Sequence, residues 1–243
     1  MRRHTLGSPQ LRLRLEAAWQ RTLEATAASI LVILALPVFA ACALAIAAES
    51  RGPVFYRCRR VGRGGRTFDM LKFRKMRADA AGPRLTAAQD ERFTRVGRRL
   101  AAWKLDELPQ LLNVVRGQMS LVGPRPEDPE FVAAVGSDFD EVLTVRPGIT
   151  GLSQLAFARE SEVLDREADR EAGYLNRLLP QKLALDSLYA RRRSLGLDLQ
   201  ILVWTAFAVF LRQDVAVNRA TGALSVRKSR ERVTDVVPER AGV

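Results

Sequence analysis

The chain has 243 residues, of which 47% are hydrophobic, and its 39 Lys and Arg against 27 Asp and Glu give a net charge of +12. This length suits one domain with appendages, and the basic excess indicates an anionic partner such as nucleic acid, anionic lipid or a phosphorylated substrate. Two cysteines, Cys42 and Cys58, and one histidine, His4, exclude a disulfide framework, the usual zinc sites and a His-dependent catalytic triad.

Residues 1–24 are basic and amphipathic, and they form the first predicted element. Their apolar residues recur at helical spacing, at Leu11, Leu15, Ala18, Trp19 and Leu23. A helix of this kind can lie on an anionic membrane surface, and an ordinary solvated helix fits the pattern equally well.

Residues 25–48 carry no charge, and their length matches a membrane helix of about 20 residues. A signal peptide fits less well, because its apolar region is shorter and a cleavage site follows it. Both flanks are basic and so favour the cytoplasmic side, and Pro37 removes a backbone hydrogen bond in mid-segment. The sequence predicts a re-entrant membrane helix bent at Pro37, with a straight span as the alternative.

A β-hairpin is predicted over residues 52–77. Residues 67–73 alternate in polarity, and Gly62, Gly64 and Gly65 supply a turn before them. These glycines are not a dinucleotide-binding fingerprint, because no helix follows them.

The adjacent carboxylates of Asp106 and Glu107 precede an apolar pattern that predicts a helix over residues 106–121. Pro109 suits its first turn, which makes Asp106 a natural N-cap. Most such pairs are only caps and solvated charge.

A chemical role is the second interpretation of this pair. A helix N-terminus keeps a carboxylate ionised and also binds phosphate, so Asp106 can attack phosphorus. Glu107 can hold Mg²⁺, which binds one or two carboxylates together with phosphate oxygens. Arg125, in the rigid turn Gly-Pro-Arg-Pro, suits bidentate contacts with phosphate.

Further helices are predicted over residues 128–145, 160–178 and 180–195, the second of them charged and solvated. The third helix carries a polar row on one face, made of Lys182, Asp186, Tyr189 and Arg193. A surface ion-pair ladder and a functional row are both open for it.

Residues 195–211 end in an apolar run too short to span a membrane, which predicts an interfacial helix anchored by Trp204 or a buried core helix. Residues 212–243 are predicted to be a polar, loosely ordered tail. Together these elements predict a helix-dominated α+β fold. It has a re-entrant membrane helix, a small β-hairpin and interfacial amphipathic helices, with a cytoplasmic catalytic domain over residues 49–211.

Five motifs make the chain resemble the bacterial sugar transferase family, the small monotopic phosphoglycosyl transferases. They are Gly52-Pro53-Val54-Phe55-Tyr56, Lys72-Phe73-Arg74, Leu105-Asp106-Glu107-Leu108-Pro109-Gln110-Leu111, Leu121-Val122-Gly123-Pro124-Arg125-Pro126 and Arg146-Pro147-Gly148-Ile149-Thr150-Gly151. A weaker match runs from Lys182 to Asp198.

The resemblance implies an enzyme on the cytoplasmic face of the bacterial inner membrane. It would transfer a sugar 1-phosphate from a nucleotide diphosphosugar to a polyprenyl phosphate such as undecaprenyl phosphate. A nucleoside monophosphate would be released, and a surface glycan such as an exopolysaccharide would be started. The resemblance also implies Mg²⁺ as cofactor and membrane lipids as partners, and it leaves a homodimer open.

The same resemblance implies roles for single residues. Asp106 would be the nucleophile that forms a phosphosugar-aspartyl intermediate, Glu107 would bind Mg²⁺, and Pro37 would bend the membrane helix. The positions that match substrate-binding residues are Lys72, Arg125, Arg159 and Asp186.

Three positions depart from the family pattern. Leu36 stands where a serine often precedes the proline, and Cys58 replaces a glutamine. Ala101 replaces an arginine five residues before the nucleophile. Its nearby substitutes are Arg98, Arg99 and Lys104.

Two other functions fit parts of the sequence. A non-enzymatic, basic adaptor on the membrane surface explains the charge and the apolar segment, but it does not explain the Asp-Glu pair. Nucleic-acid binding is disfavoured, because the arginines are spread along the chain without a recognised motif. The sequence does not name the sugar or the nucleotide, and we expect the loops around residues 78–92 and 155–180 to select them.

Overall fold

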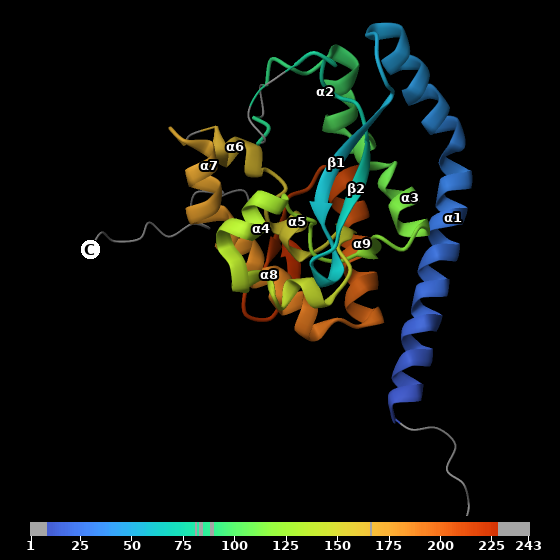
Figure 1. The fold of residues 1–243 in the computed structure, drawn as a ribbon, viewed down its shortest axis with the longest axis vertical. Helices are drawn as coiled ribbons and strands as arrows, with labels where there is room; N and C mark the ends of the chain where they lie inside the picture. Colours follow the sequence, from blue (N-terminus) through green and yellow to red (C-terminus); the bar gives the residue numbers. More distant parts are fainter. Residues whose placement is uncertain (1–8, 81, 83–84, 88–89, 166, 228–243) are drawn as a thin grey trace, which may run out of the picture.

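A single long helix, α1, lies along one side of a folded domain in the computed structural model (Figure 1). The structure describes residues 9–80, 82, 85–87, 90–165 and 167–227, with only the backbone for residues 9–17. The helices are α1 Pro9–Glu49, α2 Arg95–Ala102, α3 Gln110–Val115, α4 Pro129–Val135, α5 Leu152–Ala156, α6 Glu160–Leu164, α7 Arg170–Gly173, α8 Leu179–Arg192 and α9 Leu195–Phe210. The strands are β1 Phe55–Val61, β2 Thr67–Phe73, β3 Ser120–Val122, β4 Gly148–Thr150, β5 Val215–Val217 and β6 Leu224–Val226, which pair two by two. The predicted helix-dominated α+β fold is confirmed in this form.

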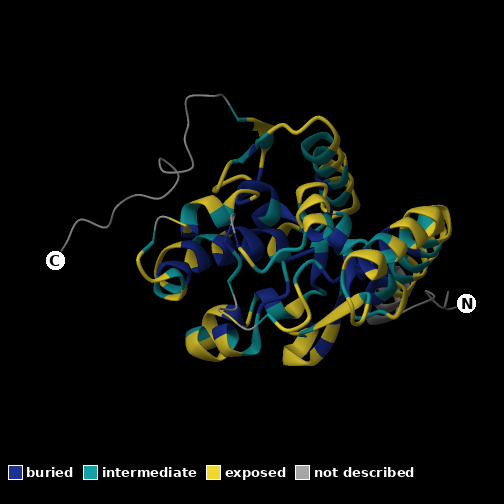
Figure 2. Cartoon of the chain, turned by 90° about the horizontal axis from the view of Figure 1, so that it is seen from above, coloured by how far each residue is buried: buried dark blue, intermediate teal, exposed yellow. Residues whose placement is uncertain are grey.

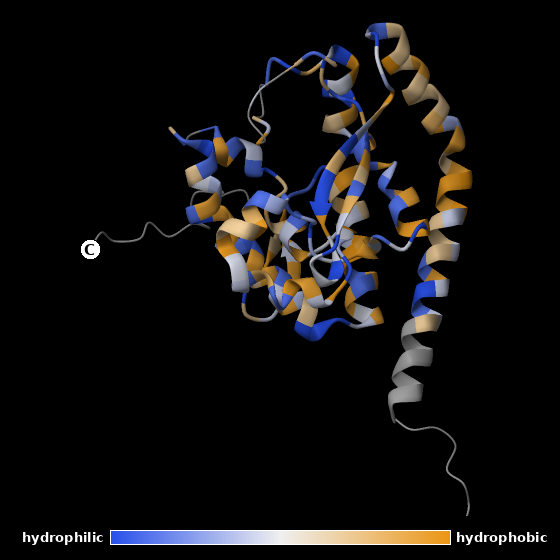
Figure 3. Cartoon of the chain, in the orientation of Figure 1, coloured by the Kyte–Doolittle hydropathy of each residue, from blue (hydrophilic) through white to orange (hydrophobic). Residues whose placement is uncertain are grey.

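Helix α1 contains the candidate membrane segment. By length and composition, Ala18–Glu49 is long and apolar enough to cross a membrane, and only 11% of its most apolar window is buried. Figures 2 and 3 show an exposed and largely apolar surface along this helix. The helix continues through Pro37 as one element and curves toward α2 (Figure 1). The long apolar helix is therefore confirmed, and its re-entrant path through a membrane stays a prediction.

One face of α1 holds it against the domain. Its buried residues Ala28, Cys42 and Ile46 are spaced so that they lie on the same side of the helix. Ala28 packs in a cluster with residues of β2 and α3, and the other two pack with Phe73 of β2 and Leu100 of α2. The apolar surface on the opposite side is left without a partner in the described part of the chain.

Strands β1 and β2 form the predicted hairpin, paired antiparallel along their whole length. The alternation in β2 buries Phe68 and Met70 against α1 and α3. In the turn, Gly64 and Gly65 have φ angles of +67° and +74°, which favour glycine. The hairpin thus follows from the alternation and the glycines that predicted it.

Asn113 fastens α3 to β2. Its fully buried side chain accepts a hydrogen bond from the backbone N–H of Leu71 at 2.9 Å. It also donates to the carbonyl of Asp69 at 2.8 Å and to the side chain of Gln118 at 2.7 Å. Because this buried amide has its partners, it fixes the separation of strand and helix. The turn before α3 is thereby held against β2.

The parallel pair β3 and β4 brings two glycine loops into contact. A Cβ on Gly148 would clash with the backbone of Gly123, so no larger residue fits there. The backbone N–H of Gly148 also donates to the carbonyl of Pro124 at 2.8 Å. These contacts fix the turn that carries Arg125.

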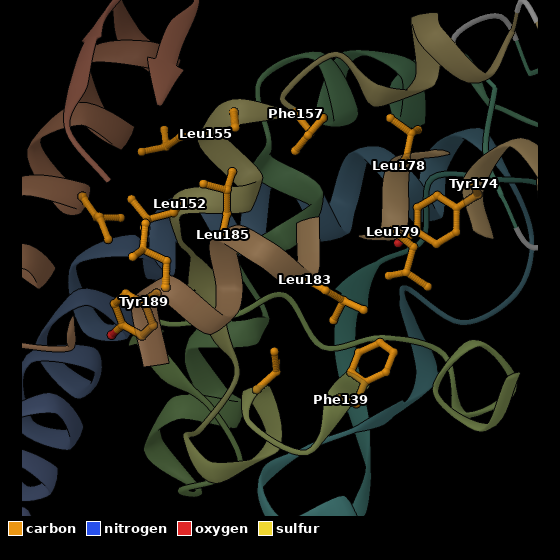
Figure 4. Packing of buried hydrophobic residues seen from close by; sticks show 14 of the residues in the cluster. Phe139, Leu152, Leu155, Phe157, Tyr174, Leu178, Leu179, Leu183, Leu185 and Tyr189 are labelled. Carbon is orange, nitrogen blue, oxygen red and sulfur yellow. The ribbon is translucent and has the colours of Figure 1, made fainter. Parts of the chain in front are cut away.

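The largest core cluster lies where α5, α8 and α9 meet. Figure 4 shows side chains of α5 and α8 gathered at its centre, among them Leu152, Leu185 and Tyr189. In α8, Lys182, Asp186 and Tyr189 are all buried, so the row on this helix is not a surface ladder. Arg193 lies beyond the end of α8 and contacts Glu24.

Helix α9 has two different faces. Ile201 is buried in the core, and Trp204 packs partly buried against it. The outer face exposes large apolar residues, namely Leu195, Leu199, Val203 and Phe210. Both predicted environments thus occur on one helix, and contact of the outer face with a membrane interface stays a prediction.

Three segments differ from the predicted elements. The helix expected over residues 128–145 stops at Val135, because Gly136 takes a φ of +67° that ends α4. The solvated helix expected over residues 160–178 is divided into α6, α7 and a π-helical turn, since the side chain of Asp169 caps a new start.

The third difference concerns the predicted tail. Within it, β5 and β6 form a hairpin, and Val215 is buried in the core because its strand packs on α5. The interpretation of residues 212–227 as a loosely ordered tail is therefore wrong. Residues 1–8 and 228–243 lie outside the described residues.

Asp186 is a carboxyl group inside the domain, only 4% exposed. Its Oδ1 has no hydrogen-bond partner in the described part of the chain. Burial raises the pKa of Asp186 to about 7, against the opposing effects of Ser153 and Lys182. The folded state therefore holds a proton at pH values where the unfolded chain has released it.

We predict that Asp186→Asn removes a pH dependence of stability. Between the usual aspartate pKa of 3.8 and about 7, the folded protein binds more protons than the unfolded chain, so its stability falls as pH rises. The slope is at most roughly 1.4 kcal/mol per pH unit. In detergent, the Tm of the variant should rise relative to wild type from about pH 5 to about pH 8. Exposed Asp140→Asn is the control, and parallel Tm curves for Asp186→Asn and wild type would contradict the prediction.

Candidate active site

A charged cavity of about 400 Å³ lies where β2, the turn before α3 and α8 meet. Its basic lining residues are Arg60, Lys72, Lys75, Arg98, Lys104, Arg125 and Lys182. Its acidic lining residues are Asp106, Glu107, Glu127, Asp128 and Glu160. The fold therefore gathers both carboxylates that the sequence singled out in one place, together with two of the predicted substrate-binding residues.

Asp106 lies in a 3₁₀ turn, Leu105–Glu107, and not at the start of an α-helix. Lys104 before it has a left-handed φ of +57°, and α3 begins only at Gln110. An N-cap residue has an extended backbone, which a residue inside a helical turn does not have. The predicted N-cap is therefore wrong, and the helix expected within residues 106–121 is confirmed only over Gln110–Val115.

Lys75 supplies the positive charge that the helix end was expected to supply. Its Nζ lies 3.3 Å from Oδ2 of Asp106, which is only 2% exposed. The same Nζ lies over the ring of Phe93, 5.5 Å from its centroid. This pairing holds the carboxylate at the wall of the cavity without any helix dipole.

Glu107 joins three segments of the chain. Its Oε1 lies 3.1 Å from Nζ of Lys72 in β2 and 3.1 Å from Nη2 of Arg125 in the Gly-Pro-Arg-Pro turn. Burial opposes the charge of Glu107, but Lys72, Arg125 and Lys104 outweigh it and hold the pKa well below its usual range. Glu107 in turn raises the pKa of Arg125 above its usual value. The result is one carboxylate between two cations that can also meet phosphate oxygens.

A second ionic cluster forms another part of the wall. Nζ of the buried Lys182 lies 3.2 Å from Glu127, 3.0 Å from Glu160 and 2.8 Å from the hydroxyl of Tyr174. Burial works against the charge of Lys182, but Glu127 and Glu160 raise its pKa well above its usual value. The sequence left open whether the polar row that contains Lys182 is functional, and it carries no signal for Glu127, Glu160 or Tyr174. Their positions depend on contacts between α6, α8 and the loop after β3.

The structure also bears on the departures from the family pattern. Ala101, Arg98 and Lys104 all line the cavity, and the two basic residues make no ion pair with a described residue. They are therefore in place to meet an anionic ligand where the family has an arginine. Cys58 packs partly buried beside the cluster of α1, β2 and α3.

Two predicted residues lie apart from the carboxylate pair. Arg159 is half exposed and lies 3.1 Å from Asp214 and 3.9 Å from Glu162. It is absent from the lining of the cavity, and so is Asp186, which lies one helical turn beyond Lys182 inside the core. The structure thus does not bring Arg159 to Asp106 and Glu107. It places Asp186 in the core, and not in the wall of the cavity.

The donor atoms set a limit on any metal site. The described residues contain no group of three or more His, Cys, Asp or Glu side chains that could hold a metal ion. Mg²⁺ does not need such a cage, because it commonly binds one or two carboxylates together with substrate phosphates. Glu107 fits this mode, since both protein cations contact the same oxygen, Oε1.

Comparison with known proteins agrees with the motifs. The model of the family "Bacterial sugar transferase" matches residues 15–212. A UDP-glucose:undecaprenyl-phosphate glucose-1-phosphate transferase of Caulobacter vibrioides is 40% identical over 205 residues, which are 82% of this chain and 72% of that protein.

Two longer relatives match over a smaller share of their length. An undecaprenyl-phosphate glucose phosphotransferase of Komagataeibacter xylinus is 37% identical over 76% of this chain and 35% of its own length. A UDP-N-acetylgalactosamine-undecaprenyl-phosphate N-acetylgalactosaminephosphotransferase of Aeromonas hydrophila is 35% identical over 76% of this chain and 42% of its own length. The fold, the charged cavity and these matches agree that the chain belongs to the bacterial sugar transferase family.

Proposed function

We propose that this chain transfers a sugar 1-phosphate from a UDP-sugar to undecaprenyl phosphate, with release of UMP, and so starts the assembly of a surface glycan. The observation that carries the proposal is the pair Asp106 and Glu107 in a cavity lined by seven basic residues: Arg60, Lys72, Lys75, Arg98, Lys104, Arg125 and Lys182. The relatives named above for transferring glucose or N-acetylgalactosamine phosphate supply the substrate classes. A membrane-surface adaptor would not need buried carboxylates with such partners.

The positive charges around the cavity suit the binding of a diphosphate. Lys72 and Arg125 meet on one oxygen of Glu107, and Arg98 and Lys104 face the cavity without an ion pair among the described residues. Basic groups oriented around one cavity interact favourably with phosphate oxygens and with the charge that develops on them during transfer. We assign the binding of the diphosphate to these four residues.

In the proposed reaction, Asp106 attacks the phosphorus that bears the sugar. A bond forms between its carboxylate oxygen and this phosphorus, and the bond to the UMP oxygen breaks, with its electron pair leaving on UMP. The phosphate of the lipid then attacks the same phosphorus and releases the aspartate. Lys75, 3.3 Å from Oδ2, holds the carboxylate in place before the attack.

A role for Asp106 as a general base is less well supported. The phosphate monoester of the lipid has a second pKa of about 6, so it is already largely ionised near neutral pH and gains little from a base. A nucleophilic carboxylate divides the transfer into two displacements with the same cationic surroundings. The buried position of Asp106 beside Lys75 fits this role.

Glu107 would hold Mg²⁺ together with phosphate oxygens of the substrate. When bound, the ion would neutralise charge on the diphosphate. The chain's own contribution is to orient this carboxylate, which Lys72 and Arg125 do through Oε1.

The proposed place of action is the cytoplasmic face of the inner membrane. The exposed apolar side of α1 and the outer face of α9 supply the surfaces that would enter the lipid. The polyprenyl chain of the acceptor would then lie in the same bilayer that holds the enzyme.

The function is tested by a screen of nucleotide sugars with undecaprenyl phosphate. We expect UMP release with one or a few UDP-sugars, together with a lipid product that carries the sugar through a diphosphate. The matched negative control is protein with Asp106→Asn, which should release no UMP. Failure of every UDP-sugar in the presence of Mg²⁺, with folded protein, would contradict the proposal.

We further predict that activity needs a hard divalent cation. Excess chelator should abolish UMP release, and added Mg²⁺ should restore it. Glu107→Gln should lower kcat by about 100- to 1000-fold, as expected when a group that stabilises charge is removed from a transition state. Glu171→Gln, on an exposed position of α7, is the control and should retain activity. Full activity in chelator would refute the metal requirement.

A further inference from the structure

A second basic cavity lies away from the one that holds the carboxylate pair. It measures about 630 Å³ and lies between the hairpin turn and the segment that follows α3. Its lining residues are Gly62, Arg63, Gly64, Arg66, Thr67, Phe68, Arg116, Gly117, Gln118 and Arg146. Four of these ten are arginines and none is acidic.

Among the described residues, none of these four arginines forms an ion pair with a carboxylate. Burial, together with Arg21 and Arg63, lowers the pKa of the Arg146 guanidinium. Glu24 is an acidic group that opposes this lowering of the Arg146 pKa. The same carboxylate also lies 3.4 Å from Arg193 and accepts a hydrogen bond from Ser120. Like charges gathered around one cavity repel one another, so a bound anion would relieve this repulsion.

Arg21 of α1 adds an unsatisfied donor at the rim. Its Nη2 donates to the carbonyl of Val115 at 2.8 Å and lies beside Gly117 of the cavity. Its Nη1 is buried with no hydrogen-bond partner in the described part of the chain. A buried donor without a partner is costly, so Arg21 adds a further unsatisfied positive group beside the cavity.

The position of Arg21 indicates the source of the anion. It precedes the uncharged run of residues 25–48 by one helical turn, which is about 6 Å along the axis. The headgroup layer on each side of a bilayer is of similar thickness, roughly 5–7 Å. If that run lies in the bilayer, Arg21 and the cavity beside it lie close to the lipid headgroups.

We propose that this cavity binds the phosphate of an anionic phospholipid headgroup through Arg63, Arg66, Arg116 and Arg146. The inference rests on the membrane placement of α1 in the proposed function. The phosphate diester takes several guanidinium donors at once. Bound there, it would hold the domain at a fixed height and tilt relative to the membrane, with the hairpin turn against the lipid surface.

The test uses full-length protein in an uncharged detergent and fluorescent phosphatidylglycerol, with phosphatidylcholine as the neutral lipid. Arg63→Gln with Arg66→Gln should weaken binding of phosphatidylglycerol about 30-fold, because each basic residue near an anionic surface contributes roughly fivefold. Both residues are exposed on the turn, so the variant should keep its fold. The control is Arg57→Gln with Arg170→Gln, an equal change of charge outside the cavity, at one exposed and one partly exposed position.

Unchanged binding by the Arg63 and Arg66 variant would overturn the inference, and so would equal weakening by the control, since binding would then follow net charge. Competition by inorganic phosphate or glycerol 3-phosphate as strong as that by the lipid would assign the cavity to a soluble phosphate and overturn the lipid assignment. UMP release by the variant in detergent without anionic lipid should equal that of wild type. Intact lipid binding by a protein that transfers no sugar phosphate would refute the proposed function and leave this inference standing.

Discussion

The contact of Glu107 with Lys72 and Arg125 is the interaction on which the site depends. It joins β2, the turn before α3 and the Gly-Pro-Arg-Pro turn, three segments far apart in the sequence, at a single carboxylate oxygen. Two neutral contacts support it from outside, the Asn113 amide between α3 and β2 and the close approach of Gly148 to Gly123. The partly buried carboxylate of Glu107 stays charged here because both cations are held at hydrogen-bond distance.

Local patterns predicted the elements that form from neighbouring residues. The hairpin followed from alternation and turn glycines, α8 followed from a polar row at helical spacing, and α9 followed from an apolar run. The failures at Asp106 and over residues 212–227 share one cause, which is that structure decided by tertiary contacts does not appear in periodicity. Lys104 adopts a left-handed conformation that ends one turn and starts another, so Asp106 is not a cap. The hairpin of β5 and β6 lies in a polar stretch, and its burial depends on packing against α5.

The residues of the candidate site divide in the same way, into those with a local sequence signal and those without one. Asp106, Glu107, Lys72 and Arg125 could be identified from motifs, because each lies in a short run with its own signal. Lys75, Glu127, Glu160 and Tyr174 could not, because they have no local signal and become partners only in the folded chain. Together the two groups form a cavity with the Asp106 carboxylate on one wall and the buried Lys182 cluster on another. The domain that holds this cavity packs against a helix suited to membrane contact.

Covalent linkage of Asp106 to the sugar phosphate can be measured in a single turnover without lipid. Enzyme mixed with its UDP-sugar and no lipid acceptor is quenched, and both UMP and the mass of the peptide that holds Asp106 are determined. We expect one UMP per active site and a mass gain of one sugar phosphate on that peptide, with both signals lost in Asp106→Asn. A wild-type enzyme that shows neither signal, yet turns over normally once undecaprenyl phosphate is added, would rule out the covalent intermediate and establish direct transfer.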